Sequence, residues 1–173
     1  MSDRRREARR IVLVPVDESR ARRLAVRHQP LPGPVPVFVA DQALCRTFGV
    51  EPDSEEAELA TLQVASVSAL SLTGRRLVLS AQLPASLLGR PVDDAETANG
   101  AASLGQLAPR QVEAFFADDD RVDAGPAAAA AAGLGIDEAW GRAAVQDLLG
   151  EPLLWHDISE LADWIDRHAT DRG

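Results

Sequence analysis

Residues 53–74, DSEEAELATLQVASVSALSLTG, determine how the rest of the chain can fold. Asp53 stands three residues before Glu56, which is a capping-box pattern, and Pro52 closes off the preceding segment. Acidic residues crowd the first turn, where the helix dipole favours negative charge. Gly74 then supplies the C′ residue at which many helices end. The pattern predicts a helix that begins at Asp53 and ends at Gly74.

This predicted helix carries no charged residue between Leu59 and Gly74. Its apolar side chains point around most of the circumference, so we expect burial on several sides. They are Leu59, Leu62, Val64, Val67, Leu70 and Leu72. A membrane span is the alternative, but the uncharged run is shorter than the roughly 20 residues that a bilayer requires, and polar side chains interrupt it. We therefore expect the central helix of a soluble domain.

The chain has 173 residues, enough for one domain with a core of its own. We expect residues 1–10 to form a basic flexible arm, residues 11–168 a single globular domain, and residues 169–173 a tail. The single cysteine, Cys45, excludes an internal disulfide and favours a reducing compartment, so we expect a cytoplasmic protein. A lone cysteine of this kind is usually a small buried hydrophobe.

The net charge of −9 is distributed unevenly. Residues 1–28 contain nine arginines and four acidic residues, so this part carries +5 and the remainder −14. An acidic body repels nucleic acid, whereas an arginine-rich arm could contact phosphate. The residues for such a contact are Arg4, Arg5, Arg6, Arg9 and Arg10. The alternative, which we favour, is an arm that is solvated or lies on the protein's own acidic surface.

Other segments have the patterns of strands and helices. The apolar run from Ile11 to Val16 is typical of a strand buried on both faces, in which Pro15 either ends the strand or occupies an unpaired position. Four prolines between Pro30 and Pro36 predict an extended connector that leads into a strand over 35–40. Further strands are predicted over 76–83, 101–107 and 111–117, and a loop is predicted over 87–100. Residues 127–132 predict a marginal helix or a tether. Other helices are predicted to be capped by Asp17 or Ser19, by Asp41, by Asp137 and by Asp157.

The order of these elements predicts an α+β domain, in which a mixed β-sheet packs against the buried central helix and the C-terminal helices. A doubly wound α/β sheet is the alternative. The first elements are compatible with a parallel start, but the later strands lack long helical crossovers.

Several segments together have a familiar pattern: the N-terminal strand that ends in valine-proline, EEAELATLQVASVSAL, RRLVLSAQLP, RQVEAFFADD and LLWHDISEL. They resemble a small bacterial α+β family of similar length that has no assigned function. The similarity covers most of residues 11–165. It implies a fold, but it carries no reaction, cofactor or catalytic residue.

Asp118, Asp119 and Asp120 follow a predicted strand that could bring them to the edge of a sheet, where hard cations collect oxygen ligands. A polar turn with three acidic residues is the other interpretation, because no EF-hand spacing accompanies them. Zinc has no ligand spacing here, since the one cysteine and three histidines are dispersed.

His156 beside Asp157 could suggest acid–base catalysis, but Asp157 already fits a helix cap with Glu160, and adjacent residues seldom face one another. The sequence also lacks the nucleophile-elbow, phosphate-loop and dinucleotide-binding glycine patterns. We therefore assign no catalytic residue and no cofactor.

The three tryptophans, Trp140, Trp155 and Trp164, all lie in the last 34 residues. Large aromatic side chains close cores and also anchor interfaces. Trp164 follows Leu161 at helical spacing, so we expect it in the core. Trp155 lies in a predicted connector, and we expect it at a protein contact.

Three functional hypotheses follow. The first is a non-enzymatic cytoplasmic interaction protein, whose partner is another protein or a second copy of the chain. The second is a small enzyme or metal-dependent hydrolase with an acidic or histidine-bearing cleft, and the third is nucleic-acid contact through the arm. No membrane partner is expected. An exposed apolar patch would favour the first hypothesis, and a pocket of converging ionisable groups the second.

Overall fold

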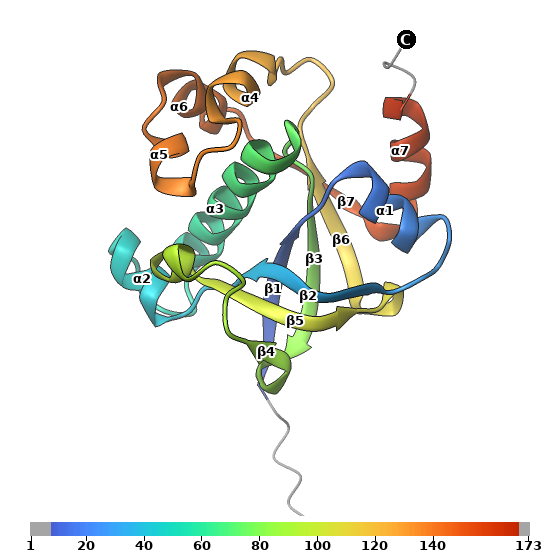
Figure 1. The fold of residues 1–173 in the computed structure, drawn as a ribbon, viewed down its shortest axis with the longest axis horizontal. Helices are drawn as coiled ribbons and strands as arrows, with labels where there is room; N and C mark the ends of the chain where they lie inside the picture. Colours follow the sequence, from blue (N-terminus) through green and yellow to red (C-terminus); the bar gives the residue numbers. More distant parts are fainter. Residues whose placement is uncertain (1–7, 170–173) are drawn as a thin grey trace, which may run out of the picture.

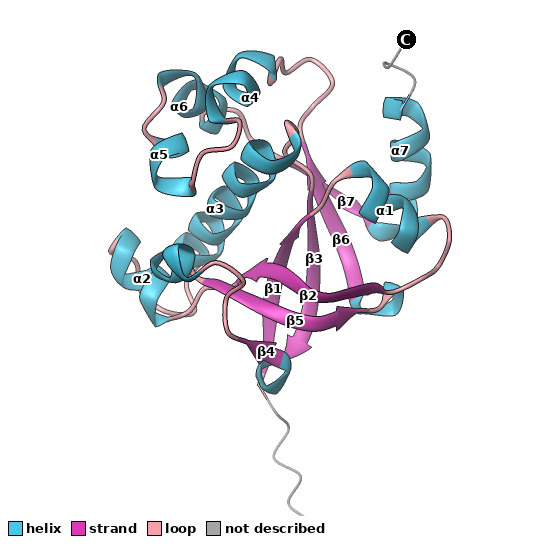
Figure 2. Cartoon of the chain, in the orientation of Figure 1, coloured by secondary structure: helices cyan, strands magenta, loops and turns pink. Residues whose placement is uncertain are grey.

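Seven strands form one sheet in the order β4-β5-β2-β1-β3-β6-β7 (Figure 2). The structure is a computed structural model that describes residues 8–169. Its strands are β1 (Arg9–Pro15), β2 (Leu31–Phe38), β3 (Val78–Pro84), β4 (Leu88–Gly89), β5 (Ala101–Leu107), β6 (Val112–Ala117) and β7 (Leu154–Asp157). The predicted α+β class is confirmed.

Helices cover both faces of this sheet (Figure 1). The α-helices are α1 (Glu18–Ala25), α2 (Gln42–Phe48), α3 (Glu55–Thr73), α4 (Gly125–Ala131), α5 (Ile136–Trp140), α6 (Ala143–Leu149) and α7 (Leu161–Ala169). Short 3₁₀ turns occupy Ala85–Leu87, Asp94–Asn99, Pro109–Gln111 and Ile158–Glu160. Helices α1 and α7 share one core with the sheet, and α2 to α6 share a second core on its other face.

Strand β1 lies in the middle of the sheet and contributes side chains to both cores. Val12 and Val14 pack with α1 and α7, whereas Leu13 packs with the α3 layer. Successive side chains of a strand point to opposite faces, so a strand covered on both faces has to be apolar throughout. The predicted two-face burial of this segment is confirmed, and the strand ends at Pro15 as expected.

The sheet is antiparallel at every pairing, so the predicted mixed sheet with a parallel start was wrong. The reason is the length of α1. Eight helical residues span about 12 Å, whereas the seven residues of β1 span about 23 Å. The helix therefore cannot return the chain to the start of β1. Strand β2 runs antiparallel to β1 and meets it only at its last residue, Phe38, opposite Leu13.

The proline-rich segment is part of β2 and not the connector that the sequence suggested. Strand β2 pairs with β5 from Leu31 to Phe38, but it pairs with β1 only at Leu13 and Phe38. Val39 donates its N–H to the Gly100 carbonyl, on the side of β2 that faces β5. Backbone N–H groups of successive residues in a strand point to opposite sides, so the nitrogen of Pro36 points toward β1. Because β2 and β5 cross β1 steeply (Figure 2), that position needs no ladder donor and a proline is tolerated.

The N-cap of helix α3 is Ser54, one residue after the predicted Asp53. Asp53 has a positive φ of 57°, whereas an N-cap needs an extended backbone, which Ser54 has. The Ser54 hydroxyl accepts the Ala57 N–H at 3.1 Å. The predicted C′ residue is confirmed, because Gly74 has a φ of 77° and donates its N–H to the Leu70 carbonyl.

The predicted burial of α3 on several sides is confirmed for most of its length but not at two positions. Val64 and Val67 are fully buried between the sheet and the helices of the same layer. Leu59 and Leu72, however, are 57% and 75% exposed. Among the described helices, none combines the length and apolarity that crossing a bilayer would take.

The segment before β7 also departs from the prediction of one helix capped by Asp137. It forms two short helices, α5 and α6, because Gly141 ends α5. Gly135 is the N-cap of α5, and Asp137 lies in its first turn, where its carboxylate accepts from Asn99 at 3.0 Å. The alanine run forms α4, and Asp157 with Glu160 forms the predicted capping box.

Strand β1 begins at Arg9, which pairs with Pro84, and Arg10 pairs with Leu83. The last two residues of the predicted arm are therefore part of the sheet. Arg4, Arg5 and Arg6 lie outside the described residues, as do residues 170–173 of the predicted tail.

Candidate docking groove

A groove of about 430 Å³ lies between the N-terminal half of α3 and the sheet. Its floor comes from β1, β3 and β6, and its walls come from α3 and from β7, the last strand of the sheet. We call it the Trp155 groove. Its lining residues are apolar Ile11, Leu13, Ala40, Leu59, Leu62, Ala114, Phe116 and Trp155, acidic Glu55, Glu58 and Glu113, and polar Thr61, Ser80 and Gln82.

Trp155 is the largest exposed side chain of the groove, with 61% of its surface accessible. It stands opposite Phe116 in the β6–β7 pairing, and both residues line the groove. His156, the next residue along β7, points to the other face of the sheet and stacks on Phe115 at a centroid distance of 4.7 Å. Strand alternation therefore fixes Trp155 on the groove side.

Two more apolar side chains that a core would normally cover are exposed here. Leu59 leaves the first turns of α3 and Ile11 leaves the first half of β1, and both line the groove. Together with Trp155 they form one apolar surface from three elements that are far apart in the sequence. The sequence interpretation treated Leu59 as buried and did not connect it with Trp155.

Glu113 reaches the groove through a bulge in β6. Ser80 pairs with Ala114 and Ala81 pairs with Val112, so Glu113 is an extra residue without a partner in β3. A bulge re-aims the side chain of the inserted residue. Val112 and Phe115 face the same core although they are three residues apart. In a regular strand only residues an even number apart share a face, so this spacing is the sequence signal for the bulge.

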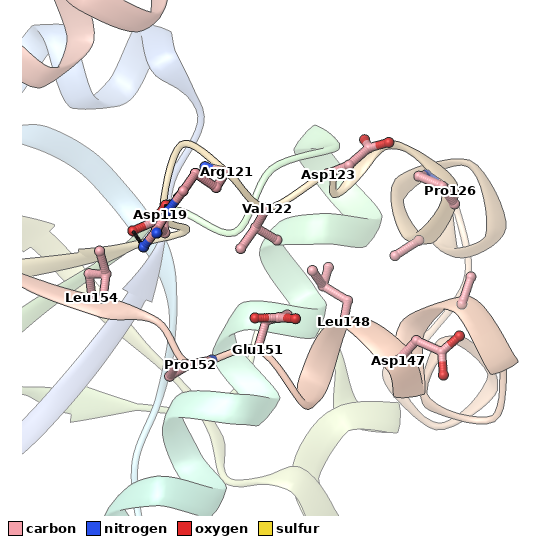
Figure 3. Close-up of a pocket in the computed structure, with 12 residues that line it drawn as sticks. Asp119, Arg121, Val122, Asp123, Pro126, Asp147, Leu148, Glu151, Pro152 and Leu154 are labelled. Carbon is pink, nitrogen blue, oxygen red and sulfur yellow. Dashed lines mark hydrogen bonds and ion pairs between the residues drawn. The ribbon is translucent and has the colours of Figure 1, made fainter.

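A larger pocket, of about 630 Å³, lies between the segment after β6 and helices α4 and α6 (Figure 3). Four acidic residues line it: Asp119, Asp123, Asp147 and Glu151. Figure 3 shows the Asp119 carboxylate turned to Arg121, whereas Asp123 and Asp147 lie on the opposite side of the pocket. The ionisable groups line one cavity but do not converge on one point within it.

The three aspartates predicted as metal ligands each contact a different side chain. Asp118 accepts from the buried Arg76 at 3.1 Å, Asp119 from Arg121 at 2.9 Å, and Asp120 lies 2.6 Å from the Nε2 atom of His168. Within residues 8–169, no group of three histidine, cysteine, aspartate or glutamate side chains could hold a metal ion. The geometry gives the metal hypothesis no support.

Arg121 also fixes the charge of Asp119. Hydrogen bonds from the Arg121 side chain and from its backbone N–H lower the pKa of Asp119 from 3.8 to about 2. Hydrogen bonds from Ser159 likewise lower the pKa of Asp157, the helix cap next to His156. Both carboxylates are therefore permanent anions at neutral pH and poor acceptors for a catalytic proton.

A third cavity, of about 410 Å³, lies between α3, β2 and the segment that leads to α5. Leu72 and Val92 are exposed beside it. Both of its acidic residues are already engaged within the chain. Asp93 accepts from the Ala95 N–H at 3.0 Å, and Glu96 accepts from the Asn99 side chain at 2.9 Å and from the Ile136 N–H at 3.1 Å. This cavity therefore differs from the Trp155 groove in having a carboxylate that is bound within the chain.

Comparisons with known proteins agree with the resemblance noted in the sequence. No curated protein and no solved structure matches this chain. Residues 6–165 match a family of unknown function, DUF6912. The match covers nearly the whole chain, so the protein belongs to the family of unknown function DUF6912.

Proposed function

We propose that this protein is a non-enzymatic interaction protein that binds a segment of another protein in the Trp155 groove. The observation that carries the proposal is the exposure of Trp155 over a groove whose other exposed large apolar residues are Leu59 and Ile11. The lone cysteine, Cys45, is buried and unbridged, which supports a cytoplasmic site for this interaction.

Burial of this surface would be favourable. Covering apolar surface stabilises a complex by about 25 cal/mol per Å², and an aromatic side chain carries on the order of 150–250 Å². Trp is among the residue types that dominate measured binding energies when they sit in a concave, desolvated site. The groove also differs from a flat patch, since Leu59 and Trp155 stand on opposite walls.

The enzyme hypothesis has less support from the geometry. The acidic pocket of Figure 3 contains carboxylates that do not meet, and one of them is held as an anion by Arg121. His156 stacks on Phe115 and stands 4.0 Å from Glu160, a residue of the helix cap. Neither arrangement places an acid and a base beside a common cavity.

The proposal is tested by affinity capture from an extract of the source cells, followed by mass spectrometry, with three baits. They are the wild type, Trp155→Ala, and the control Leu72→Ala, which removes an even more exposed apolar side chain beside the third cavity. We expect a protein that the wild type and the Leu72 variant capture and the Trp155 variant does not. Identical capture by all three baits, with all three folded, would contradict the proposal.

A further inference from the structure

Three carboxylates line the Trp155 groove. Glu55 and Glu58 lie in the first turns of α3, and the bulge in β6 adds Glu113. Within residues 8–169, no ion pair engages any of the three. By contrast, Asp118 and Asp119 in the segment after β6 are each bound by an arginine, Arg76 and Arg121. Arg9 and Arg10 line the adjoining cavity beside Glu58 but form no described ion pair with it, so the groove combines apolar walls with three carboxylates whose hydrogen-bonding capacity is open to a ligand.

Arginine is the side chain whose chemistry fits this combination. Its aliphatic stem covers apolar surface, its planar guanidinium stacks on an aromatic ring, and its paired N–H groups bind a carboxylate in a bidentate manner. Trp155 offers the exposed ring, and Phe116 lies opposite it across the strand pair. A lysine ammonium satisfies the charge but neither stacks as a plane nor binds a carboxylate through two donors.

We infer that the Trp155 groove binds an arginine of a partner protein, flanked by apolar residues, with its guanidinium over the Trp155 ring and held by Glu58 and Glu113. This inference rests on the proposed function and specifies the partner. A second copy of the chain is a poorer occupant. Its own groove carries the same three acids, and two bodies with a net charge of −9 repel each other.

The probe is a set of four synthetic heptapeptide libraries whose central residue is fixed as Arg, Lys, Gln or Glu and whose other positions hold apolar residues or Gly. Selection on the immobilised full chain should enrich the Arg library over the Lys library and retain neither of the other two. The affinity of one enriched peptide, measured by fluorescence anisotropy, should fall as salt rises, because an ion pair at an accessible groove is screened.

Variants of the full chain then locate the binding site. Trp155→Ala should abolish binding of the peptide, and Glu113→Gln and Glu58→Gln should each weaken it by about tenfold. Asp147→Asn removes the same charge from the acidic pocket of Figure 3 and should change the affinity by less than about twofold. Equal losses in all three charge variants would show attraction to the acidic body as a whole and would overturn the inference.

The remaining outcomes separate the inference from the proposed function. If a Trp155-dependent peptide shows no preference for a central Arg, the groove still binds protein segments but the inference fails. If no library binds and the capture experiment shows no effect of Trp155→Ala, the proposed function fails as well. Two further results would overturn the inference of an external partner. A Trp155-dependent dimer in sedimentation would show that a second copy occupies the groove. Tighter peptide binding after Arg4, Arg5 and Arg6 are changed to Gln would show that the chain's own arginines compete for it.

Discussion

Trp155 of β7 and Trp164 of α7 are nine residues apart, and their surroundings differ at every level. Trp164 is 5% exposed and packs between Phe115, at 5.9 Å, and His168, at 4.1 Å, with the Arg75 guanidinium 5.5 Å from its ring. Trp155 makes no such ring contact within residues 8–169 and is 61% exposed over a groove. A covered tryptophan closes a core, whereas an uncovered one over a concave surface indicates a contact that the chain does not complete by itself.

The largest effect that tests this contrast is expected at Trp164. Trp164→Ala removes a packed aromatic side chain from the α7 core and should lower the free energy of unfolding by about 3–5 kcal/mol. Urea denaturation followed by circular dichroism measures it. A variant as stable as the wild type would show that Trp164 is not a core residue, and the contrast with Trp155 would then be lost.

Adjacent aspartates offer the same contrast between buried and exposed groups. Asp118 pairs with Arg76, whose side chain is almost fully buried, so Asp118→Ala leaves a buried cation without its anion and should cost about 3 kcal/mol. Asp119 pairs with the exposed Arg121, and Asp119→Ala should leave the urea midpoint close to that of the wild type. Similar midpoints for the two variants would contradict this difference in burial.

A smaller effect is expected at the start of α3, which forms one wall of the groove. Ser54→Ala removes the hydroxyl that accepts the Ala57 N–H and should cost about 1 kcal/mol. Asp53→Gly provides the matched control, because it removes a side chain that does not cap the helix and because glycine adopts the positive φ of this position without strain. If the control is the more destabilising of the two, the cap was assigned to the wrong residue.

The smallest expected effect is on the stability of the protein at low pH. The pKa of Asp119 is lowered in the folded chain from 3.8 to about 2, so its contribution to stability is present above pH 3.8 and is lost as the pH falls toward about 2. The free energy of unfolding of Asp119→Asn should therefore decrease less than that of the wild type as the pH falls through this window. Added salt should reduce the difference between the two proteins, because the Asp119–Arg121 pair is exposed. Parallel pH profiles for the two proteins would exclude this contribution.

Much of the fold could be predicted from local patterns. Gly74 ended α3, Asp41 and Gly49 enclosed α2, and Asp157 with Glu160 formed a capping box, because each of these signals acts within a few residues. The predictions that failed depended on distant partners. The prolines of β2 are tolerated only because β1 pairs with β2 at one position, which local patterns could not show.

The groove was predictable only in part. The placement of Trp155 in a connector suggested a contact residue, and the structure adds that the connector is an edge strand. Glu113 and Leu59 could not be assigned to the same site from sequence, because one depends on the register between β3 and β6 and the other on how α3 lies across the sheet. Sites assembled from separate elements leave weak traces in any single segment.

The docking groove is tested most directly by photo-crosslinking at position 155. Trp155 is replaced by benzoylphenylalanine in the source cells, and Leu72, which lies beside the third cavity, is replaced in the same way as a control. If the groove binds a partner, irradiation should yield a discrete adduct with another protein from position 155 and none from position 72. The absence of an adduct at position 155, or the same adduct from both positions, would contradict the assignment of the Trp155 groove as the docking surface.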